Sequence, residues 1–457
     1  MRSFILSTFL LISFSHLQAQ QNDSVVFRNI ANDILLNGQA YQNLRVLCKQ
    51  IGARLPGTPQ QLKAEQTTAQ MMRQMGADTV YFQECLVPHW VRGEKETAYI
   101  IAADSKKVSL DICALGNSVG TGKGGLKADI VEVKSFQQLD ELGEKGIKGK
   151  IVFYNVRFDQ THIKPYNGYE ETTGYRWNGP SKAARYGALG TVIRSLASNT
   201  DDHPHTGGMR YNDSFPKIPC IAISAIDGDY LAAELNKRKP VSLYFRTTCQ
   251  TLPKVPGHNV IGEIRGSTSP DQIITIGGHL DSWDLAEGAH DDGTGCVQSM
   301  ELIRVYKKLG IRPKHTIRVV LFADEENGGA GGDKYAELAK TDSRKLLFAL
   351  ESDDGGFVPR AFRFTLDETK LEKYRQWLPL FIPYGVYTFI SGESGADIET
   401  LNSLGAVLAG LEPDPQRYFD IHHSSVDIFE NVNKRELELG AINMAMLVYM
   451  MDQYGIQ

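Results

Sequence analysis

The stretch that decides the fold runs from Ile273 to Gly295 and reads IITIGGHLDSWDLAEGAHDDGTG. It begins as an apolar run typical of a buried strand and changes abruptly at His279-Leu280-Asp281. Asp291 and Asp292 follow twelve residues after the histidine, and a glycine-rich turn then leads into a helical pattern. Because buried acids and imidazoles are costly unless they are paired, this strand end predicts a functional site. A divalent metal is the simplest partner.

Strand and helix patterns alternate from residue 259 to the end of the chain. Strands are expected at 260–265, 273–278, 316–323, 346–351 and 406–411, and helices at 296–308, 330–339, 370–380, 396–404 and 434–454. This alternation predicts an α/β fold with a mainly parallel sheet flanked by helices. Such sheets place their sites at the carboxyl ends of the strands, which is where the acidic clusters of the sequence fall.

The chain has 457 residues, too many for one ordinary core, so we expect two domains or one domain with a large insertion. Residues 1–19 have the pattern of a secretory signal peptide. Residues 20–104 and 247–457 are interpreted as the two parts of a catalytic domain. Residues 105–246 show short strand patterns and turns, which predicts an inserted β-rich domain.

Two polar segments of the insert, 167–178 and 198–215, are expected to be long loops. Loops over 156–178 and 198–215 could close a substrate cleft or could be solvated surface. The sequence favours neither reading.

Composition and charge are those of an ordinary globular protein. Hydrophobic residues make up 42% of the chain and charged residues 23%. The net charge of −5 becomes −6 without residues 1–19, which contain Arg2 and no acid. This mild acidity gives no reason to expect a nucleic acid or an anionic membrane as partner. After the signal no apolar run is long enough to span a bilayer. No cysteine lies near the expected cleavage point, which argues against a lipid anchor. We therefore expect an exported protein, periplasmic or extracellular.

The six cysteines lie at positions 48, 85, 113, 220, 249 and 296. They are too few and too widely spaced for a disulfide scaffold or a CxxC metal site. One or two disulfide bridges stay open as alternatives, and their pairing cannot be read. Cys296 fits a small buried residue better than a nucleophile.

Three further groups of acids and histidines follow the expected strands. They are Asp324-Glu325-Glu326, then Glu351-Ser352-Asp353-Asp354, and finally His422-His423. Any one of them alone would usually be polar surface, but carboxylates gathered at one sheet edge repel one another unless a cation compensates. Imidazole and carboxylate ligands without cysteine suit catalytic zinc, and this set is large enough for two bridged ions. One acid must stay uncoordinated to move a proton, and two neighbouring glutamates meet that need.

The order HxD, DDGTG, EE, ESD, HH resembles the di-zinc exopeptidase family, which includes bacterial secreted aminopeptidases and glutamate carboxypeptidases. The likeness covers nearly all of the chain after the signal and is greatest to the secreted dipeptidases of this family. Within the insert, GKIVF from Gly149 and KAARYGALG from Lys182 resemble a protease-associated domain.

The resemblance implies two zinc ions per chain. The implied ligands are His279 and Asp353 for one ion, Glu326 and His423 for the other, and Asp291 as the bridge between them. The peptide bond from Asp291 to Asp292 is often cis in relatives.

Several further roles are implied in the same way. Glu325 would be the general base that takes a proton from the water activated by the metals and passes it to the leaving amine. Asp281 would orient His279 by accepting its second N–H, and Asp427 could do the same for His423.

Many aminopeptidase relatives carry a tyrosine before the last histidine, where it stabilises the oxyanion. This sequence has His422 there, and an imidazole N–H could supply the same hydrogen bond. The loop Glu393–Asp397 could contact a peptide terminus near the cleft or could be a turn that caps the following helix.

These features favour a zinc-dependent exopeptidase that hydrolyses short peptides, dipeptides above all. The alternatives are a glutaminyl cyclase-like one-zinc transferase and a non-enzymatic binding protein on the same fold. The intact ligand set argues against the binding protein, and a role for His279 at a second ion argues against the transferase. Homodimerisation is compatible with the resemblance, but the sequence has no sign of it. The end of the peptide that is recognised cannot be read either.

Overall fold

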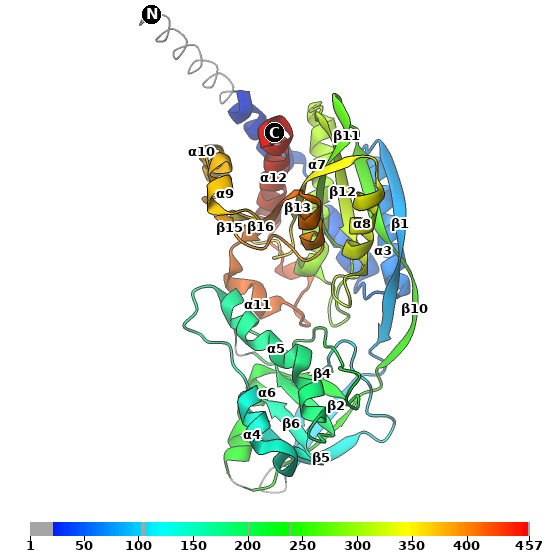
Figure 1. Ribbon diagram of the computed structural model, residues 1–457, viewed down its shortest axis with the longest axis vertical. Helices are drawn as coiled ribbons and strands as arrows, with labels where there is room; N and C mark the ends of the chain where they lie inside the picture. The colour runs from blue at the N-terminus through cyan, green and yellow to red at the C-terminus, as the bar shows by residue number, and fades with distance from the viewer. Residues whose placement is uncertain (1–21, 102–105, 200, 238, 456–457) are drawn as a thin grey trace, which may run out of the picture.

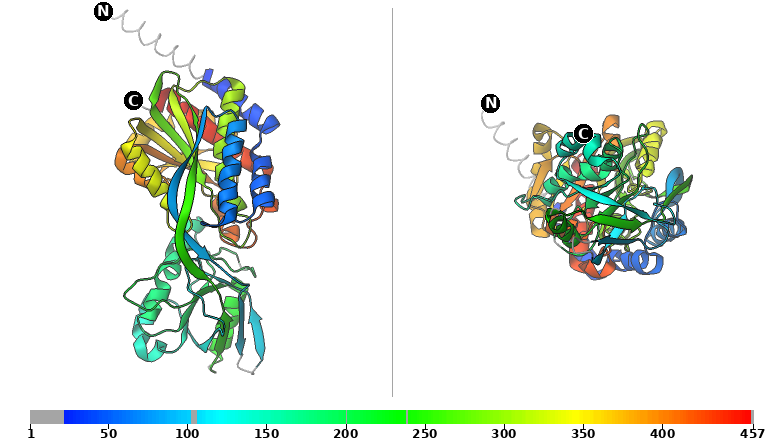
Figure 2. Two further views of the ribbon diagram at one scale, coloured as in Figure 1. Left: turned by 90° about the vertical axis from the view of Figure 1, so that its right-hand side faces the viewer. Right: turned by 90° about the horizontal axis from the view of Figure 1, so that it is seen from below.

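The computed structural model describes residues 22–101, 106–199, 201–237 and 239–455 (Figure 1). The predicted signal peptide, residues 1–19, lies outside them. Two eight-stranded sheets form two lobes, one above the other in Figure 1. The long strands β1 (Thr79–Val91) and β10 (Gln250–Ile264) pair along their length and run from one lobe towards the other (Figure 2).

The sheet of the upper lobe has the order β1-β10-β12-β11-β13-β16-β14-β15. The other strands are β11 (Ser269–His279), β12 (His315–Phe322), β13 (Lys345–Glu351), β14 (Pro359–Phe364), β15 (Thr388–Ser391) and β16 (Val407–Pro413). The four central strands β12, β11, β13 and β16 are parallel, and antiparallel pairs flank them. The predicted α/β fold with a mixed, centrally parallel sheet is confirmed.

Helices cover both faces of this sheet because its central strands are apolar on both sides. A helix over residues 22–37, α2 (Ala40–Val46), α3 (Pro59–Gln74), α7 (Thr294–Leu309) and α12 (Lys434–Met450) lie on one face, and α8 (Ala330–Thr341) lies on the other. In β11, Ile274 and Ile276 join the first core, whereas Ile273 joins the second. This is the two-residue alternation of a strand buried on both faces.

The lower lobe contains the second sheet, with the order β3-β2-β9-β5-β6-β7-β8-β4. Its strands are β2 (Thr97–Ile101), β3 (Lys107–Leu110), β4 (Ile112–Ala114), β5 (Leu126–Val133), β6 (Ile151–Tyr154), β7 (Gly190–Arg194), β8 (Cys220–Ile223) and β9 (Ser242–Arg246). The helices are α4 (Phe136–Ile147), α5 (Pro165–Ala184) and α6 (Ala225–Asn236). We expected β2 within residues 20–104 of the catalytic domain, but its backbone pairs with β3 and β9 in this sheet.

The segment 167–178, which we expected to be a loop, lies inside helix α5. Three glycines and Pro180 lower its intrinsic helix propensity, which explains the error. Burial of one side of the helix compensates, because Gly168, Thr172 and Arg176 recur at a spacing of four residues and are all buried. The expected helix at 396–404 is instead a 3-10 helix, η4 (Glu399–Leu404), and 370–380 divides into α9 (Glu368–Arg375) and α10 (Leu378–Phe381).

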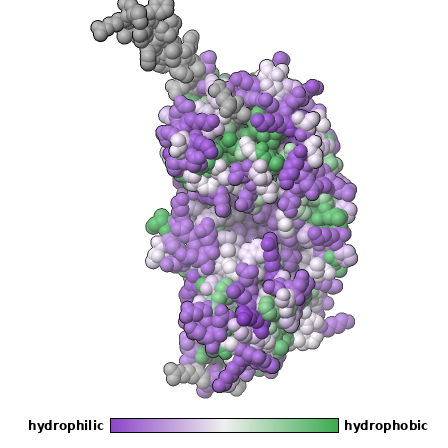
Figure 3. All heavy atoms as spheres, in the orientation of Figure 1, coloured by the Kyte–Doolittle hydropathy of each residue, from purple (hydrophilic) through white to green (hydrophobic). Residues whose placement is uncertain are grey.

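All six cysteines belong to the described residues, and each is buried and unpaired. The disulfide bridges left open by the sequence are therefore absent. No helix within the described ranges is long and apolar enough to cross a membrane. Hydrophilic side chains cover most of the face drawn in Figure 3.

Candidate metal centre

The polar clusters of the sequence meet at the end of the upper sheet that faces the lower lobe. Strand β11 ends at His279, and Asp353 follows β13 by two residues. Glu326 follows β12 by four residues. Strand β12 lies beside β11 in the sheet, so Glu326 and His279 come from neighbouring strands. Asp291 lies in the turn before α7, and His423 follows the short helix α11 (Tyr418–Ile421).

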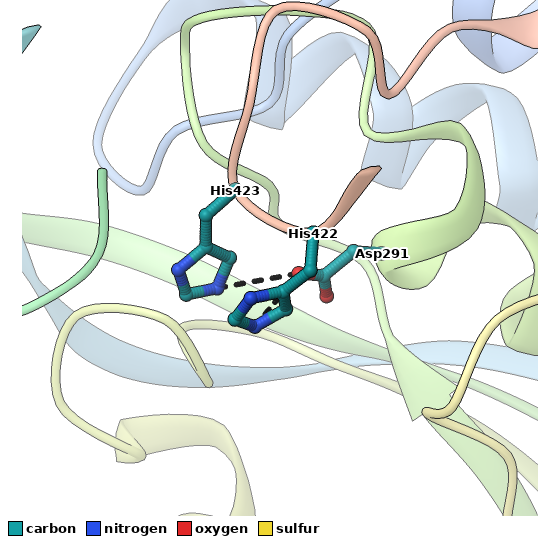
Figure 4. A group of neighbouring side chains, drawn as sticks. All are labelled: Asp291, His422 and His423. Atoms are coloured by element: carbon teal, nitrogen blue, oxygen red, sulfur yellow. Dashed lines mark ion pairs between the residues drawn. The ribbon is translucent and has the colours of Figure 1, made fainter. Parts of the chain in front are cut away.

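Asp291 lies between two histidine–acid pairs. His279 Nε2 is 3.0 Å from Asp353 Oδ1 and 3.1 Å from Asp291 Oδ1. His423 Nε2 is 3.0 Å from Glu326 Oε2 and 3.3 Å from Asp291 Oδ2 (Figure 4). The two oxygens of one carboxylate thus face two separate pairs, which is the arrangement that a carboxylate bridging two ions requires.

The charges of this group fit a cation. Burial raises the pKa of the Glu326 carboxyl to about 7 and also raises that of Asp353. Glu326 Oε1 is buried and has no hydrogen-bond partner within the described part of the chain. An orphaned buried carboxylate oxygen costs free energy that a metal ion would recover. The oxygen and imidazole donors present are the ligands that zinc accepts.

Two aspartates beside the predicted ligands hold the backbone in place. Asp292 accepts hydrogen bonds from the backbone N–H groups of His279 (3.0 Å) and Gly295 (2.9 Å). Asp281 accepts from those of Glu325 (3.0 Å) and Glu326 (3.2 Å). The peptide bond between Asp291 and Asp292 is cis, as the resemblance implied.

The contact between Asp281 and His279 differs from the expected one. His279 Nδ1 lies 3.1 Å from the backbone oxygen of Asp281 and 3.6 Å from its carboxylate. The carbonyl is therefore the nearer acceptor, because the carboxylate points to the two glutamate amides.

Asp427 does not take the role that we considered for it beside His423. Its carboxylate accepts from the backbone N–H groups of His290 (2.7 Å) and Asp291 (3.2 Å). His423 Nδ1 instead lies 3.4 Å from the backbone oxygen of Thr206, in the lower lobe.

Glu325 faces the cavity beside these predicted ligands and is only partly buried. No hydrogen bond reaches its carboxylate from any residue that the structure describes. Burial raises the pKa of this carboxyl well above its usual value, and the acids Asp353 and Glu326 raise it further. An acid with a raised pKa and free oxygens is suited to accept and release a proton.

His422 stacks on His423 with ring centroids 3.5 Å apart, and its Nε2 is 3.8 Å from Asp291 Oδ2. Segment 198–215 holds this turn from the lower lobe. His205 Nδ1 lies 2.6 Å from the backbone oxygen of His422, and the Thr206 N–H donates to that of His423 (2.9 Å).

A cavity of about 390 Å³ opens above these residues, between the two lobes. Its wall on the upper lobe includes Glu325, Asp353 and the loop Glu393–Ala396. Helix α5 and the neighbouring chain supply the other wall, with Tyr166, Tyr169, Thr173, Arg176, Trp177 and Gly208. The volume is near the lower limit of the range of about 300–1,000 Å³ for ligand pockets, which suits a small ligand.

Comparison with known proteins identifies the family. Residues 259–448 match the family model described as Peptidase family M28. Carboxypeptidase Q of Mus musculus is 34% identical over 411 residues, which are 90% of this chain and 85% of the relative. Carboxypeptidase Q of Homo sapiens is also 34% identical, over 90% of this chain and 84% of the relative. The chain belongs to peptidase family M28. It is therefore a metallopeptidase, as the sequence predicted.

Solved structures of two peptidases have the same fold. The peptidase M28 precursor of Shewanella amazonensis superimposes with a TM-score of 0.90 at 31% identity and covers 96% of this chain and 98% of that one. A zinc aminopeptidase of Bacillus subtilis gives a TM-score of 0.65 at 19% identity over 92% of this chain and 96% of its own. The second likeness concerns the fold alone.

The cavity of this M28 peptidase includes side chains that the sequence analysis did not select. Tyr166, Tyr169, Arg176 and Trp177 come from α5, a segment that we had read as loop. The available signal was the concentration of aromatic residues in a polar stretch, which is unusual for a solvated loop. Their approach to the metal centre depends on the docking of the two lobes, and no local pattern records it.

Proposed function

We propose that this M28 peptidase is a zinc-dependent exopeptidase that hydrolyses short peptides, dipeptides above all. The observation that carries the proposal is the position of Asp291, whose two oxygens face His279 and His423 at 3.1 and 3.3 Å beneath a small cavity. The names of two relatives agree with this activity, since both are carboxypeptidase Q.

Two zinc ions would be held by five side chains: His279, Asp353, Asp291, Glu326 and His423. When bound, zinc polarises the peptide carbonyl and lowers the pKa of a water molecule. The ligands fix where this happens, because three come from the ends or turns of neighbouring parallel strands. Asp281 binds the backbone amide of Glu326, and Asp427 binds that of Asp291. These two hydrogen bonds fix the positions of the Glu326 and Asp291 side chains relative to the two histidines.

In this proposal Glu325 is the general base. Its carboxylate takes the proton of the attacking water and delivers it to the amine that leaves, so that one side chain completes the proton transfer. His422 donates an imidazole N–H to the carbonyl oxygen as negative charge develops there. Both side chains line the cavity, as these roles require.

The lower lobe supports the preference for short substrates. We propose that residues 105–246 form a protease-associated domain, and that the wall it contributes through α5 limits the length of the peptide. A cavity of about 390 Å³ that is lined by both lobes accepts a small peptide more readily than a long chain. Residues 1–19 would direct export to the periplasm or the extracellular space.

The alternative functions fit less well. A one-zinc transferase has no use for a second histidine–acid pair, yet Glu326 and His423 lie 3.0 Å apart. A binding protein without catalysis has no need of a free, partly buried Glu325 beside the ligands.

A panel of peptides tests the proposal. The protein is treated with a chelator, reconstituted with zinc and assayed with free dipeptides, N-blocked dipeptides, C-blocked dipeptides and longer peptides. We expect no hydrolysis by the chelated protein and rapid hydrolysis of free dipeptides after zinc is added. Equal activity with and without zinc, or no activity on any peptide with a free terminus, would overturn it.

A further inference from the structure

Arg176 is a buried cation at the cavity wall. It lies on α5 of the lower lobe, its side chain is only 3% exposed, and it lines the cavity. Its Nη2 donates a hydrogen bond to the hydroxyl of Tyr169 at 2.7 Å, and the guanidinium carbon lies 5.5 Å from the centre of the Tyr169 ring. A buried arginine almost always has an anionic partner, since desolvation of an unpaired charge is costly.

No such partner exists among the residues that the structure describes. None of the described carboxylates comes within ion-pair distance of Arg176, and its Nε is buried without any hydrogen-bond partner. Arg363, the other arginine of the cavity, differs in this respect because its Nη2 is paired with Glu412 at 3.1 Å. Arg176 is therefore a cation of the cavity wall without a described acidic partner, whereas Arg363 is already paired with an acid.

The guanidinium lies beside the proposed reaction centre. A Cβ atom built on Gly207 would lie 2.4 Å from Arg176 Nη1 and 2.8 Å from His423 Nδ1, so both side chains approach the same glycine.

A cation next to the predicted ligands suits the free carboxylate of a dipeptide. Consecutive Cα atoms are about 3.8 Å apart, so the free carboxylate of a dipeptide lies one residue beyond the bond that is cleaved. A group that binds this carboxylate must therefore lie next to the metal ligands. Arginine is the side chain best suited to it, because its planar fork can donate two parallel hydrogen bonds to a carboxylate.

We infer that Arg176 binds the free α-carboxylate of the substrate and thereby makes this enzyme selective for peptides that end one residue after the cleaved bond. The inference rests on the proposed function and adds to it the end of the peptide that is recognised. It also gives the lower lobe a direct part in substrate selection, since Arg176 belongs to α5.

The test compares two substrates with several variants. The substrates are a dipeptide with a free carboxylate and the same dipeptide with a C-terminal amide. Arg176→Met should lower kcat/KM for the free dipeptide about 10- to 100-fold, mainly through KM, which is the range for hydrogen bonds to charged groups. Hydrolysis of the amide should not change. Arg176→Lys should keep part of the preference, because it retains the charge without the fork.

Arg210→Met is the matched control. Arg210 packs against the ring of Trp177 at 4.7 Å, as Arg176 does at 5.9 Å, but it is exposed and does not line the cavity. This variant should hydrolyse both substrates like the unaltered enzyme. An equal loss on the free dipeptide and its amide in Arg176→Met would overturn the inference, because it would indicate a general structural role.

Calorimetric binding with Glu325→Gln protein adds a readout without turnover. This protein should bind the free dipeptide more tightly than the amide. The double variant Glu325→Gln/Arg176→Met should bind the two with equal affinity. If the unaltered enzyme hydrolyses neither substrate, the proposed function fails, and binding still decides on Arg176. A difference in affinity that survives the loss of Arg176 would contradict the inference.

Discussion

The imidazole of His422 lies nearly parallel to that of His423, with ring centroids 3.5 Å apart and an interplanar angle of 20°. Burial and the charge of His423 together hold the pKa of His422 well below its usual value. His422 lines the cavity, and in the proposed function it donates one N–H there while His423 serves as a metal ligand. This pairing gives the two adjacent histidines different tasks.

The role of His422 predicts a change in turnover without a change in metal content. His422→Phe should lower kcat about 10²- to 10³-fold, the usual cost of losing one oxyanion donor. His422→Tyr restores a donor and should recover activity relative to His422→Phe. Steady-state kinetics and elemental analysis of the three proteins check this. Loss of zinc from His422→Phe would indicate that His422 is a ligand instead.

Replacement of Glu325 should separate proton transfer from metal binding. Glu325→Gln should lower kcat about 10²- to 10⁴-fold, because the amide cannot accept the proton, while the zinc content stays the same. Glu337→Gln serves as the control, since Glu337 is exposed on α8 and pairs with Lys334. Full activity in Glu325→Gln would exclude Glu325 as the base.

The backbone contacts of Asp281 predict an effect on stability as well as activity. Asp281→Asn replaces one acceptor oxygen by a donor, so at least one of the amides of Glu325 and Glu326 loses its bond. We expect a decrease of about 1–3 kcal/mol in the free energy of unfolding and a lower kcat. Denaturant titration of the zinc-free protein measures the first effect. A variant as stable and active as the parent would contradict the proposed support.

The buried position of Glu301, away from the proposed metal centre, predicts that the stability of the fold depends on pH. This buried glutamate of α7 pairs with Arg304, yet burial dominates and raises its pKa from 4.5 to about 7. At a pH between these two pKa values, Glu301 is more often protonated in the folded state than in the unfolded state. Its contribution to the free energy of unfolding therefore falls as the pH rises from about 4.5 to 7. Glu301→Gln removes the titration.

The variant should match the parent near pH 4.5 and exceed its stability at pH 8 by about 3 kcal/mol, the equivalent of the shift in pKa. Urea denaturation at several pH values measures the difference. A constant difference across this range would show that Glu301 does not titrate in this way.

The central strands were predictable because their signal is local. Ile273–Gly278 is apolar on both faces and changes to His279 where β11 ends, so the strand and the end of the sheet that carries the site can both be read from the sequence. The clusters after β12 and β13 follow by the same argument, since parallel neighbours end at the same edge.

The side of the cavity formed by the lower lobe was not predictable in this way. Helix α5 has poor intrinsic propensity and is stabilised by packing, and Arg176 and Tyr169 approach His422 only after the lobes have docked. The supporting contacts are of the same kind. Asp281 and Asp427 bind backbone amides that are distant in the sequence. We expected these aspartates to contact the side chains of the histidines, and no sequence pattern indicates the backbone contacts.

The most direct test of the account is the number of zinc ions bound per chain. The central claim is that Asp291 bridges two ions, one beside His279 and Asp353 and the other beside Glu326 and His423. Elemental analysis of the purified protein, saturated with zinc and freed of excess metal, should give two ions per chain. A value of one in the fully saturated, active protein would contradict the account and would favour a one-zinc mechanism.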